Sequence, residues 1–283
     1  MILSFHPCIT ADHQIILGHR QPDSDDESFI SKAELIILPQ TCSEKLFAVC
    51  AKSNASIFPD YHARFDYPGK VGQSVLFEKE SLPQPETFRW NSIDHFIHAI
   101  DKSLPHNYPF LLKEDMRHEA EGIHLIKDVN DIEISLKKMM IKNNLGNVRF
   151  VSQEFIHTGG NALRVVIMTD FYISYWKRPG VPGQVISTVS NGARVDKKWR
   201  PELQEKSVDM AKRLSERTGI NLAAVDFVFN LDDPDPEPLF LEINYSFGRT
   251  GLGGTIYYYE LLSRAITSWM DKNGFNSKKV KLV

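Results

Sequence analysis

The sequence predicts a mixed architecture in which a small α/β unit precedes a larger α+β unit. Residues 1–85 carry short apolar runs around a helical stretch, a pattern typical of a small and largely parallel sheet. Clusters of proline and glycine at 65–73 and 82–88 then indicate the end of this unit. Further along, strands follow one another closely enough to pair antiparallel. We therefore divide the chain into three predicted domains, 1–86, 87–157 and 158–283.

The first domain is predicted to contain short buried strands and one helix. The polar segment 21–28 is expected to be a loop or the start of a helix, with its acidic run facing solvent. The predicted strands are 1–5, 14–18, 34–40 and 55–59, and the predicted helix is 43–54.

Helical periodicity recurs at several places in the rest of the chain. A helix is expected to begin at Ser92, because apolar residues recur at i, i+3, i+4 and i+7 from Ile93 onward. Pro201 near the start and Gly219 past the end delimit another helix. This helix covers 201–219, and the remaining predicted helices are 131–142 and 258–270.

The remaining apolar runs are predicted strands. We expect 148–156, 163–169 and 171–176 to form one antiparallel sheet, and the tail 276–283 to be frayed. The other predicted strands are 110–113, 123–126, 223–229 and 238–244.

Composition and charge exclude several classes of protein. The 283 residues are 42% hydrophobic and 24% charged, which are ordinary values for a soluble globular protein. A net charge of −3 argues against a nucleic-acid partner, and no apolar run approaches the roughly 20 residues that span a bilayer. The first residues show no signal segment, and the three cysteines match no zinc or redox spacing. We therefore expect a cytoplasmic protein without nucleic-acid or membrane partners.

Two apolar strands near the C-terminus carry isolated oxygen-bearing side chains. In the second strand, Phe240, Glu242 and Asn244 point to one face, because side chains alternate along a strand. In the first strand, Asp226 stands alone among apolar neighbours. A hairpin folded symmetrically about Pro234 sets Asp226 directly opposite Glu242. The sequence therefore predicts that an aspartate, a glutamate and an asparagine converge on one sheet face.

These side chains admit two interpretations. Oxygen ligands suit hard cations, and Mg²⁺ typically takes few protein carboxylates and completes its shell with phosphate and water. Alternatively, the two carboxylates are solvated on an open sheet face, which would spare them the repulsion of a close pair. The apolar surroundings and the glycines that follow Asn244 favour the metal site.

Several short motifs occur in a fixed order between about residues 60 and 270. They are Lys113, QEFI (153–156), Arg164, SNGAR (190–194), Asp226 in VDF and EIN (242–244). With this ordered set the chain resembles the ATP-grasp superfamily, and it is most similar to the RimK-like carboxylate–amine ligases. Residues 1–60 resemble the small α/β domain that usually precedes this fold.

The resemblance implies a reaction and its cofactors. Enzymes of this kind bind ATP between two subdomains, phosphorylate a carboxylate and let an amine attack the acyl phosphate, with release of ADP and phosphate. Two divalent cations, Mg²⁺ or Mn²⁺, would neutralise the phosphates, held by Asp226, Glu242 and Asn244. The expected substrates are a small carboxylate and an amine, such as an amino acid or peptide, and a homodimer is common for the fold.

The resemblance also assigns roles to single residues. Lys113, and by a looser match Lys70, would contact phosphates. Arg164 would steady the acyl phosphate, and Arg249 would contact the substrate. The residues matched to the adenine-binding hinge are Glu154, Phe155 and Ile156, and those matched to nucleotide- or phosphate-side positions are Ser190 and Asn191.

Departures from the family pattern leave two alternatives open. Ala162 stands where RimK-like enzymes usually have an aspartate, and Phe247 precedes Gly248 where the family often reads S-P-G. The loop that ends at Gly122 occupies the place of the glycine-rich lid but holds many charges. The chain is therefore expected to be a ligase, with an ATP-binding regulator without turnover and a kinase that phosphorylates a hydroxyl as the alternatives.

Overall fold

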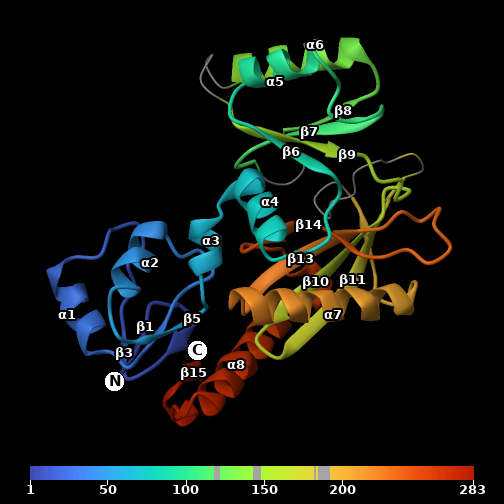
Figure 1. Cartoon of the computed structure of the whole chain (residues 1–283). Helices are drawn as coiled ribbons and strands as arrows, with labels where there is room; N and C mark the ends of the chain where they lie inside the picture. The colour runs from blue at the N-terminus through green and yellow to red at the C-terminus, as the bar shows by residue number, and fades with distance from the viewer. Residues whose placement is uncertain (118–121, 143–147, 182, 184–191) are drawn as a thin grey trace.

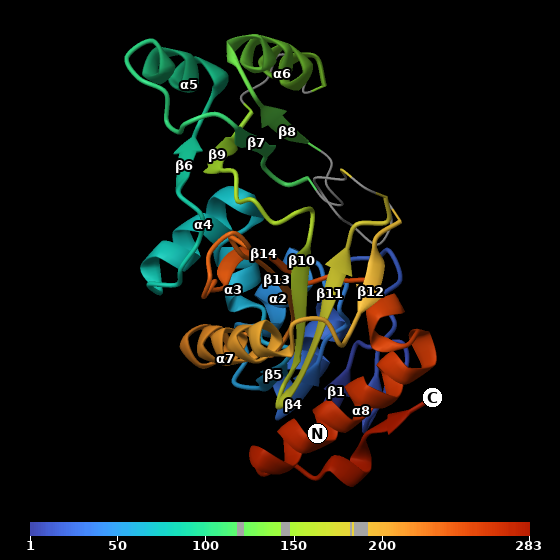
Figure 2. The ribbon, with the colours of Figure 1, turned by 90° about the vertical axis from the view of Figure 1, so that its right-hand side faces the viewer.

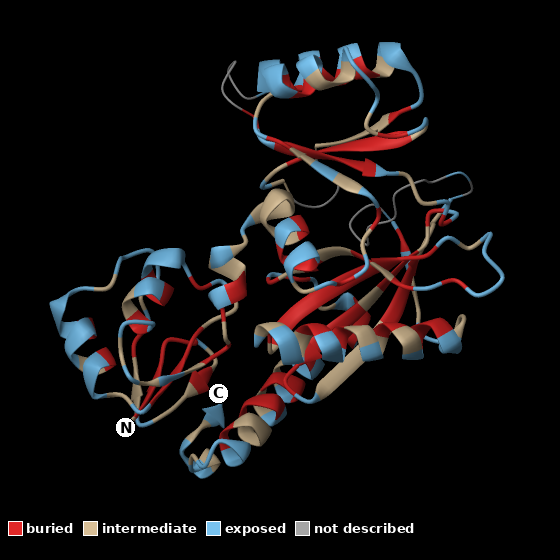
Figure 3. Ribbon diagram, viewed as in Figure 1, coloured by how far each residue is buried: buried red, intermediate tan, exposed pale blue. Residues whose placement is uncertain are grey.

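The structure is a computed structural model that describes the chain except for residues 118–121, 143–147, 182 and 184–191. Three main sheets follow one another along the chain, each accompanied by helices (Figure 1). Buried residues are concentrated on the sheets and on the helix faces that pack against them (Figure 3). Of the helices in the described part of the chain, none is long and apolar enough to cross a membrane.

The N-terminal sheet is parallel throughout, in agreement with the alternating pattern of its sequence. The predicted strand 14–18 is shorter than expected and ends at Gln14. Helices α1 (Ser24–Lys32) and α2 (Glu44–Cys50) connect the strands. The strand order is β3 (His13–Gln14), β1 (Ile2–Ser4), β4 (Leu35–Ile37) and β5 (Ser56–Phe58).

The acidic segment 21–28 starts helix α1. Asp23 caps the helix, because its side chain accepts hydrogen bonds of 3.0 Å from the backbone N–H groups of Asp25 and Asp26. Asp26 is buried and pairs with Arg20, which contradicts the expectation that the whole acidic run faces solvent. Negative charge at a helix start is favourable, so these carboxylates stabilise local structure.

The second sheet forms a separate lid with both of its helices on one face (Figure 1). Alternation along its strands gives it two different faces. In β7, Phe110 and Leu112 pack under the helices, whereas Leu111 and Lys113 point to the other face. The strand order is β6 (Thr87–Trp90), β9 (Phe150–Glu154), β7 (Phe110–Glu114) and β8 (Ile123–Ile126), and the helices are α5 (Ile93–Ile100) and α6 (Val129–Lys142).

The third sheet is antiparallel and lies between two long helices (Figure 2). Helix α7 (Pro201–Thr218) covers one face, and α8 (Thr255–Lys272) covers part of the other. Gly219 lies just past the end of α7, as predicted, and adopts the left-handed conformation. The strand order is β12 (Arg194–Asp196), β11 (Phe171–Arg178), β10 (Ala162–Met168), β13 (Leu222–Val228) and β14 (Leu239–Asn244).

Two sequence-based expectations about pairing are wrong. The strand predicted at 148–156 was expected to join 163–169 and 171–176, but as β9 it pairs with β6 and β7 in the lid. The tail was expected to be frayed, but β15 (Lys281–Leu282) pairs with β2 (Ile9–Thr10). In both cases a strand pairs with a partner that is distant in sequence. Local sequence patterns do not encode the choice of such a partner.

Helix α8 joins the N-terminal sheet to the third sheet. Its apolar side packs against Ile37 and Phe58 of the N-terminal sheet and against Val166 and Met168 of the third sheet, in one continuous core. The two sheets are therefore fixed relative to each other by a shared helix.

A β-bulge sets which residues of β14 face the polar side of the third sheet. Asp226 lies opposite Glu242, as predicted, but the register shifts beyond this pair and Phe227 lies opposite Phe240. Phe240 is fully buried against Phe77 and Phe227, so the prediction that it shares a face with Glu242 is wrong. Leu241 instead lines the cavity beside Glu242.

Helix α4 (Gly69–Lys79) is one of the elements that the sequence analysis missed. It follows the short helix α3 (His62–Asp66) and runs along the open edge of β14. The Gln73 side chain binds the backbone of Ile243 twice, donating to its carbonyl oxygen and accepting from its N–H, each at 2.8 Å. A side-chain amide thus satisfies an edge strand as another strand would.

We expect Phe240→Ala to lower the free energy of unfolding by about 3–5 kcal/mol, because it opens a cavity in the core. Leu241→Ala, one residue along, should cost about 1 kcal/mol or less, since Leu241 faces the cavity. Urea unfolding of the two variants measures both values. Equal losses, or the reverse order, would contradict the bulge.

Candidate active site

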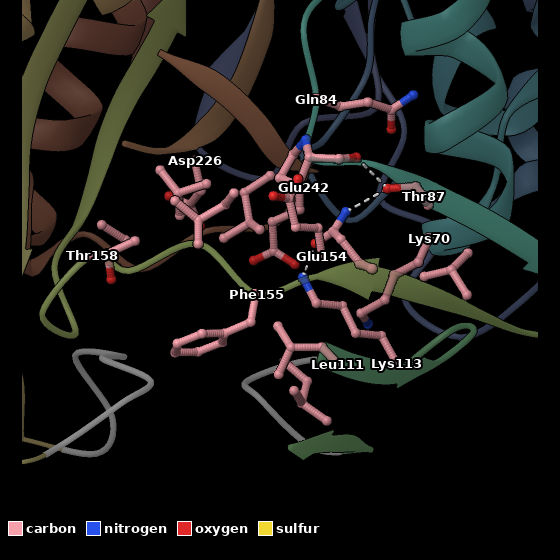
Figure 4. A pocket seen from close by; sticks show the side chains of 18 of the residues that line it. Lys70, Gln84, Thr87, Leu111, Lys113, Glu154, Phe155, Thr158, Asp226 and Glu242 are labelled. Carbon is pink, nitrogen blue, oxygen red and sulfur yellow. Dashed lines mark hydrogen bonds between the residues drawn. The ribbon is translucent and has the colours of Figure 1, made fainter. Parts of the chain in front are cut away.

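One cavity lies between the lid and the third sheet (Figure 4). The lid contributes the face of β7 and β9 that is turned away from its helices, and the third sheet contributes the polar end of β10, β13 and β14. Helix α4 closes one side with Lys70 and Gln73. Of the residues predicted to bind a ligand, the cavity is lined by Lys70, Lys113, Glu154, Phe155, Ile156, Asp226 and Glu242.

Asp226 forms a buried cluster with two cations. Arg164 donates from Nε to Oδ1 and from Nη2 to Oδ2, both at 2.7 Å. Lys177 donates from Nζ to Oδ2 at 2.8 Å. These residues lie side by side because Arg164 is paired with Asp226 across the sheet and Lys177 is on the next strand, opposite Ala162. The cluster therefore has a net charge of +1.

The electrostatics of the cluster follow from burial and pairing. Asp226 is fully buried, which by itself would raise the pKa of its carboxyl group, but Arg164 and Lys177 outweigh burial and hold that pKa well below its usual range. Burial would lower the pKa of Arg164, and Asp226 reverses this and raises it. Asp226 and Arg164 are therefore both charged at neutral pH.

Glu242 and Asn244 complete the polar end of the sheet. The Asn244 Nδ2 donates to Glu242 Oε1 at 3.0 Å and to Asp226 Oδ2 at 3.2 Å. Glu242 has no ion-pair partner among the described residues and faces the cavity. The predicted convergence of these three side chains is thus observed, whereas their role as metal ligands stays a prediction.

The donor set fits a hard cation. Glu242 and the Asn244 Oδ1 accept no hydrogen bond from a cationic side chain in the described part of the chain, and Asp226 Oδ1 accepts only one, from Arg164. Two carboxylates with an amide are a set that Mg²⁺ accepts when phosphate and water supply the remaining oxygens. No group of three or more His, Cys, Asp or Glu side chains suited to a metal occurs among the described residues.

Two lysines stand on the opposite side of the cavity. The Lys113 Nζ donates to Gln153 Oε1, and the Lys70 Nζ donates to the backbone oxygen of Arg117. Burial lowers the pKa of Lys113 to about 8; Glu242 opposes this effect and Lys70 adds to it. Burial also lowers the pKa of Lys70, against the nearby charge of Glu242. The cavity is therefore cationic on both walls.

The predicted hinge residues connect the lid to the third sheet. Glu154 ends β9, and its backbone N–H donates to the Glu86 carbonyl oxygen at 2.9 Å. Phe155 packs edge-on against His157, with ring centroids 5.1 Å apart. Apolar side chains beside them, Leu111 and Leu241 among others, make this end of the cavity suitable for a flat aromatic ligand.

Other predicted positions lie outside the cavity or outside the described residues. Arg249 follows β14 and does not line the cavity; its guanidinium lies 4.6 Å from the ring centroids of both Tyr258 and Tyr259. Ser190 and Asn191 fall outside the described residues, as does part of the lid loop, 118–121. Their roles stay predictions, as do the domain boundaries.

Sequence reasoning missed several polar side chains that line the cavity, among them Lys177, Gln153 and Thr87. Lys177 is buried beside Asp226, and the Gln153 Nε2 donates to Thr87 Oγ1 at 2.9 Å. A signal for Lys177 was present, because a lysine ends the apolar run of β11 on the face that carries Tyr175. Gln153 and Thr87 gave no such signal, since their pairing joins strands distant in sequence.

Comparison with solved structures identifies several similar folds. A RimK-domain ATP-grasp protein from Sphaerobacter thermophilus superposes with a TM-score of 0.58 at 15% identity, over 89% of each chain. A D-alanine–D-alanine ligase from Bacillus anthracis gives a TM-score of 0.61 at 13% identity, over 90% of this chain and 84% of that one. The predicted architecture is confirmed by these matches.

A third similar structure was solved with a nucleotide. It is a carboxyaminoimidazole ribonucleotide synthase from Aspergillus clavatus complexed with ATP, with a TM-score of 0.57 at 14% identity, over 83% of this chain and 59% of that one. The chain thus spans about three fifths of that synthase. No protein-family model matches the sequence, and no curated protein matches it.

We expect Asp226→Asn to lower the free energy of unfolding by about 3–5 kcal/mol, because it leaves two buried cations without their counter-ion. Glu242→Gln makes the same chemical change one strand away and should cost less than about 1 kcal/mol, since Glu242 has no ion pair to lose. Urea unfolding at neutral pH compares the two. A small effect of Asp226→Asn would refute the ion-pair cluster.

Proposed function

Because this chain has the ATP-grasp fold, we propose that it is an ATP-dependent ligase that joins a carboxylate to an amine through an acyl phosphate. The observation that carries the proposal is the cavity with cationic side chains on two walls and the Asp226 and Glu242 carboxylates at one end, both hydrogen bonded by Asn244. The ATP complex of one similar structure and the ligase activity named for another support it.

The nucleotide would lie along the cavity. Its adenine would occupy the apolar end, between Leu111 of the lid and Leu241 of the third sheet, beside Phe155 and Ile156. Its phosphates would then extend toward Lys70 and Lys113, and both lysines can leave their present oxygen partners, Arg117 and Gln153, for stronger anionic ones.

Mg²⁺ would be held by Glu242, Asn244 and the Oδ1 of Asp226. When bound, it would neutralise the charge of the triphosphate and polarise the transferred phosphoryl group. Phosphoryl transfer requires positioned charge more than a nucleophilic side chain, and the cavity offers such charge. We propose two such ions, with Mn²⁺ as a substitute.

Arg164 and Lys177 would act on the carboxylate substrate. An oxygen of that carboxylate attacks the γ-phosphorus and ADP leaves; the amine nitrogen then attacks the acyl carbon, and phosphate leaves with the bonding electrons as the amine loses a proton. Both steps place negative charge on oxygens, which fixed cations stabilise at little reorganisation cost. Asp226 keeps the two cations fixed, so it would act as a positioning residue as well as a cation ligand.

We propose a cytoplasmic location for the protein. All three cysteines, Cys8, Cys42 and Cys50, are free thiols, which suits a reducing compartment. Burial raises the pKa of Cys42 and Cys50 to about 12, so neither is a reactive thiolate.

Incubation with Mg²⁺–ATP, a pool of small carboxylates and amino acids, and hydroxylamine tests the proposal. We expect ADP release that depends on the pool, together with a hydroxamate formed from the trapped acyl phosphate. ADP release with a phosphorylated hydroxyl and no hydroxamate would instead establish the kinase alternative. ATP binding without any ADP release would establish the regulator.

Glu242→Ala should abolish ADP release, because it removes a carboxylate of the proposed cation site, while the variant stays folded by circular dichroism. Glu216→Ala, an exposed glutamate on α7, is the matched control and should be fully active. Turnover by Glu242→Ala at the wild-type rate would remove the basis for the cation site.

We expect ATP affinity to fall as the pH rises past about 8. The lowered pKa of Lys113 means that its positive charge is present below about pH 8 and lost above it. The Kd should therefore weaken about tenfold between pH 7 and pH 9, because about one lysine in ten stays charged one unit above its pKa. Lys113→Arg should flatten the profile, as titration calorimetry can measure. A flat wild-type profile would exclude Lys113 from phosphate binding.

A further inference from the structure

A network of hydrogen bonds on the helix side of the lid sheet ends at the segment that leads into the lid. Its central residue is His106, on the connection between α5 and β7, whose side chain is 2% exposed. The ring lies against Phe88 and Phe110, whose ring centroids are 5.2 Å and 5.6 Å from its own. We call this group the lid network; it consists of Glu86, Trp90, His106 and Ser152.

The hydrogen bonds of the lid network run in one direction. Trp90 Nε1 donates to Ser152 Oγ at 2.9 Å, and the Ser152 Oγ lies 3.2 Å from His106 Nε2. The Ser152 hydroxyl makes no other hydrogen bond in the described part of the chain, so its hydrogen is donated to Nε2. The ring hydrogen of His106 is therefore on Nδ1, which donates to Glu86 Oε2 at 3.1 Å.

The lid network reaches beyond the core of the lid. Trp90 and Ser152 are buried, whereas the Glu86 side chain is 60% exposed. The pairing of an indole N–H with a serine hydroxyl requires no carboxylate. The histidine instead continues the chain of hydrogen bonds out of the core to a charged residue, and hydrogen bonds to charged groups are the stronger kind.

Glu86 joins the two segments that connect the lid to the rest of the chain. Its carbonyl oxygen accepts from the Glu154 N–H at 2.9 Å, and its own N–H donates to Glu154 Oε2 at 3.4 Å. Glu86 directly precedes β6, and Glu154 ends β9. The entry and the exit of the lid therefore lie side by side, and His106 holds the entry segment from the helix side.

The same two segments line the apolar end of the cavity. Gln84 and Pro85 line it on the entry side, and residues 154–156 line it on the exit side (Figure 4). Pro83 and Pro85 restrict the backbone of the entry segment, and the Pro83 carbonyl oxygen accepts from the Phe240 N–H at 2.8 Å. This segment is thus fixed at one end by the third sheet and at the other end by the lid network.

We propose that His106 is a positioning residue for the base of the bound nucleotide. His106 does not line the cavity itself. By holding Glu86, it fixes the two segments between which the base lies, because Glu86 carries the acceptor that pairs one segment with the other. The inference rests on the proposed function in so far as the cavity binds ATP with its base at the apolar end, and it does not require ligase turnover.

Three variants separate the contact with Glu86 from the contact with Ser152. His106→Asn places an amide nitrogen near the position of Nδ1 and keeps the donor to Glu86. His106→Gln places its amide near the position of Nε2, so it keeps the contact with Ser152 and loses that donor. Glu86→Ala removes the acceptor from an exposed side chain, so it should stay folded even if a histidine variant does not.

Titration calorimetry of the full-length chain with Mg²⁺–ATP and with Mg²⁺–tripolyphosphate measures the contribution of the base. His106→Gln and Glu86→Ala should weaken the Kd of ATP about tenfold and leave that of tripolyphosphate within about twofold of the wild type, because only the base is misplaced. His106→Asn should bind both ligands as the wild type does. The matched control is Glu133→Ala, which removes a lid glutamate whose ion pair with Lys137 stays within α6.

Two further measurements address the contact directly. His106→Gln and Glu86→Ala break the same hydrogen bond, so the double variant should bind ATP no more weakly than either single variant. In hydrogen exchange without ligand, the Glu154 amide should exchange faster in these two variants than in the wild type and in His106→Asn, because its acceptor belongs to Glu86.

The pattern of results decides between the possible roles. Equal losses for ATP and tripolyphosphate would show that the lid network only stabilises the lid, and the positioning role would be wrong. Wild-type ATP affinity in both His106→Gln and Glu86→Ala, or an equal loss in His106→Asn and His106→Gln, would overturn it as well. If the expected pattern occurs in a chain that releases no ADP with any pool, only the ligase proposal fails. A wild-type chain that binds no ATP would overturn both proposals.

Discussion

Asp226 places a full negative charge on the buried face of a five-stranded sheet, where it holds the side chains of Arg164 and Lys177 in place. Buried charge is tolerated only when it is paired and hydrogen bonded, and each of these three groups depends on the others for that condition. Asn244 extends the network to Glu242, so the polar end of the sheet is one connected unit. The geometry of the proposed phosphoryl-transfer site therefore depends on a single carboxylate.

Local patterns were sufficient to predict this unit in outline. Isolated polar residues in apolar strands stand out, and Asp226 and Glu242 were set opposite each other by the length of their hairpin alone. Helix α7 was equally predictable, because Pro201 is typical of a first helical turn and Gly219 is typical of the position after the last turn. The parallel N-terminal sheet followed from alternation of strand and helix.

What the sequence could not reveal depends on tertiary contacts. The bulge beside Asp226 turns Leu241 toward the cavity and Phe240 into the core, and strict alternation predicts the opposite for Phe240. Helix α4 has few helical signals in its sequence. It begins at Gly69, which follows a proline and has φ +69°. The contact between the Tyr258 hydroxyl and Gln40 joins residues 218 positions apart, and spacing along the chain does not reveal it.

Helix α4 holds the lid as well as the edge of β14. Its N-terminal turn binds the lid, since the Val71 N–H donates to Asp115 Oδ1 at 3.2 Å and Lys70 reaches the Arg117 carbonyl oxygen. Its next turn binds Ile243 through Gln73. The lid is thus connected to the rest of the chain by the covalent segments before β6 and after β9 and by these contacts of α4. A movement of the lid therefore requires either rotation about α4 or loss of the contacts that α4 makes with the lid. This one helix links the position of the lid to β14, the strand that carries Glu242.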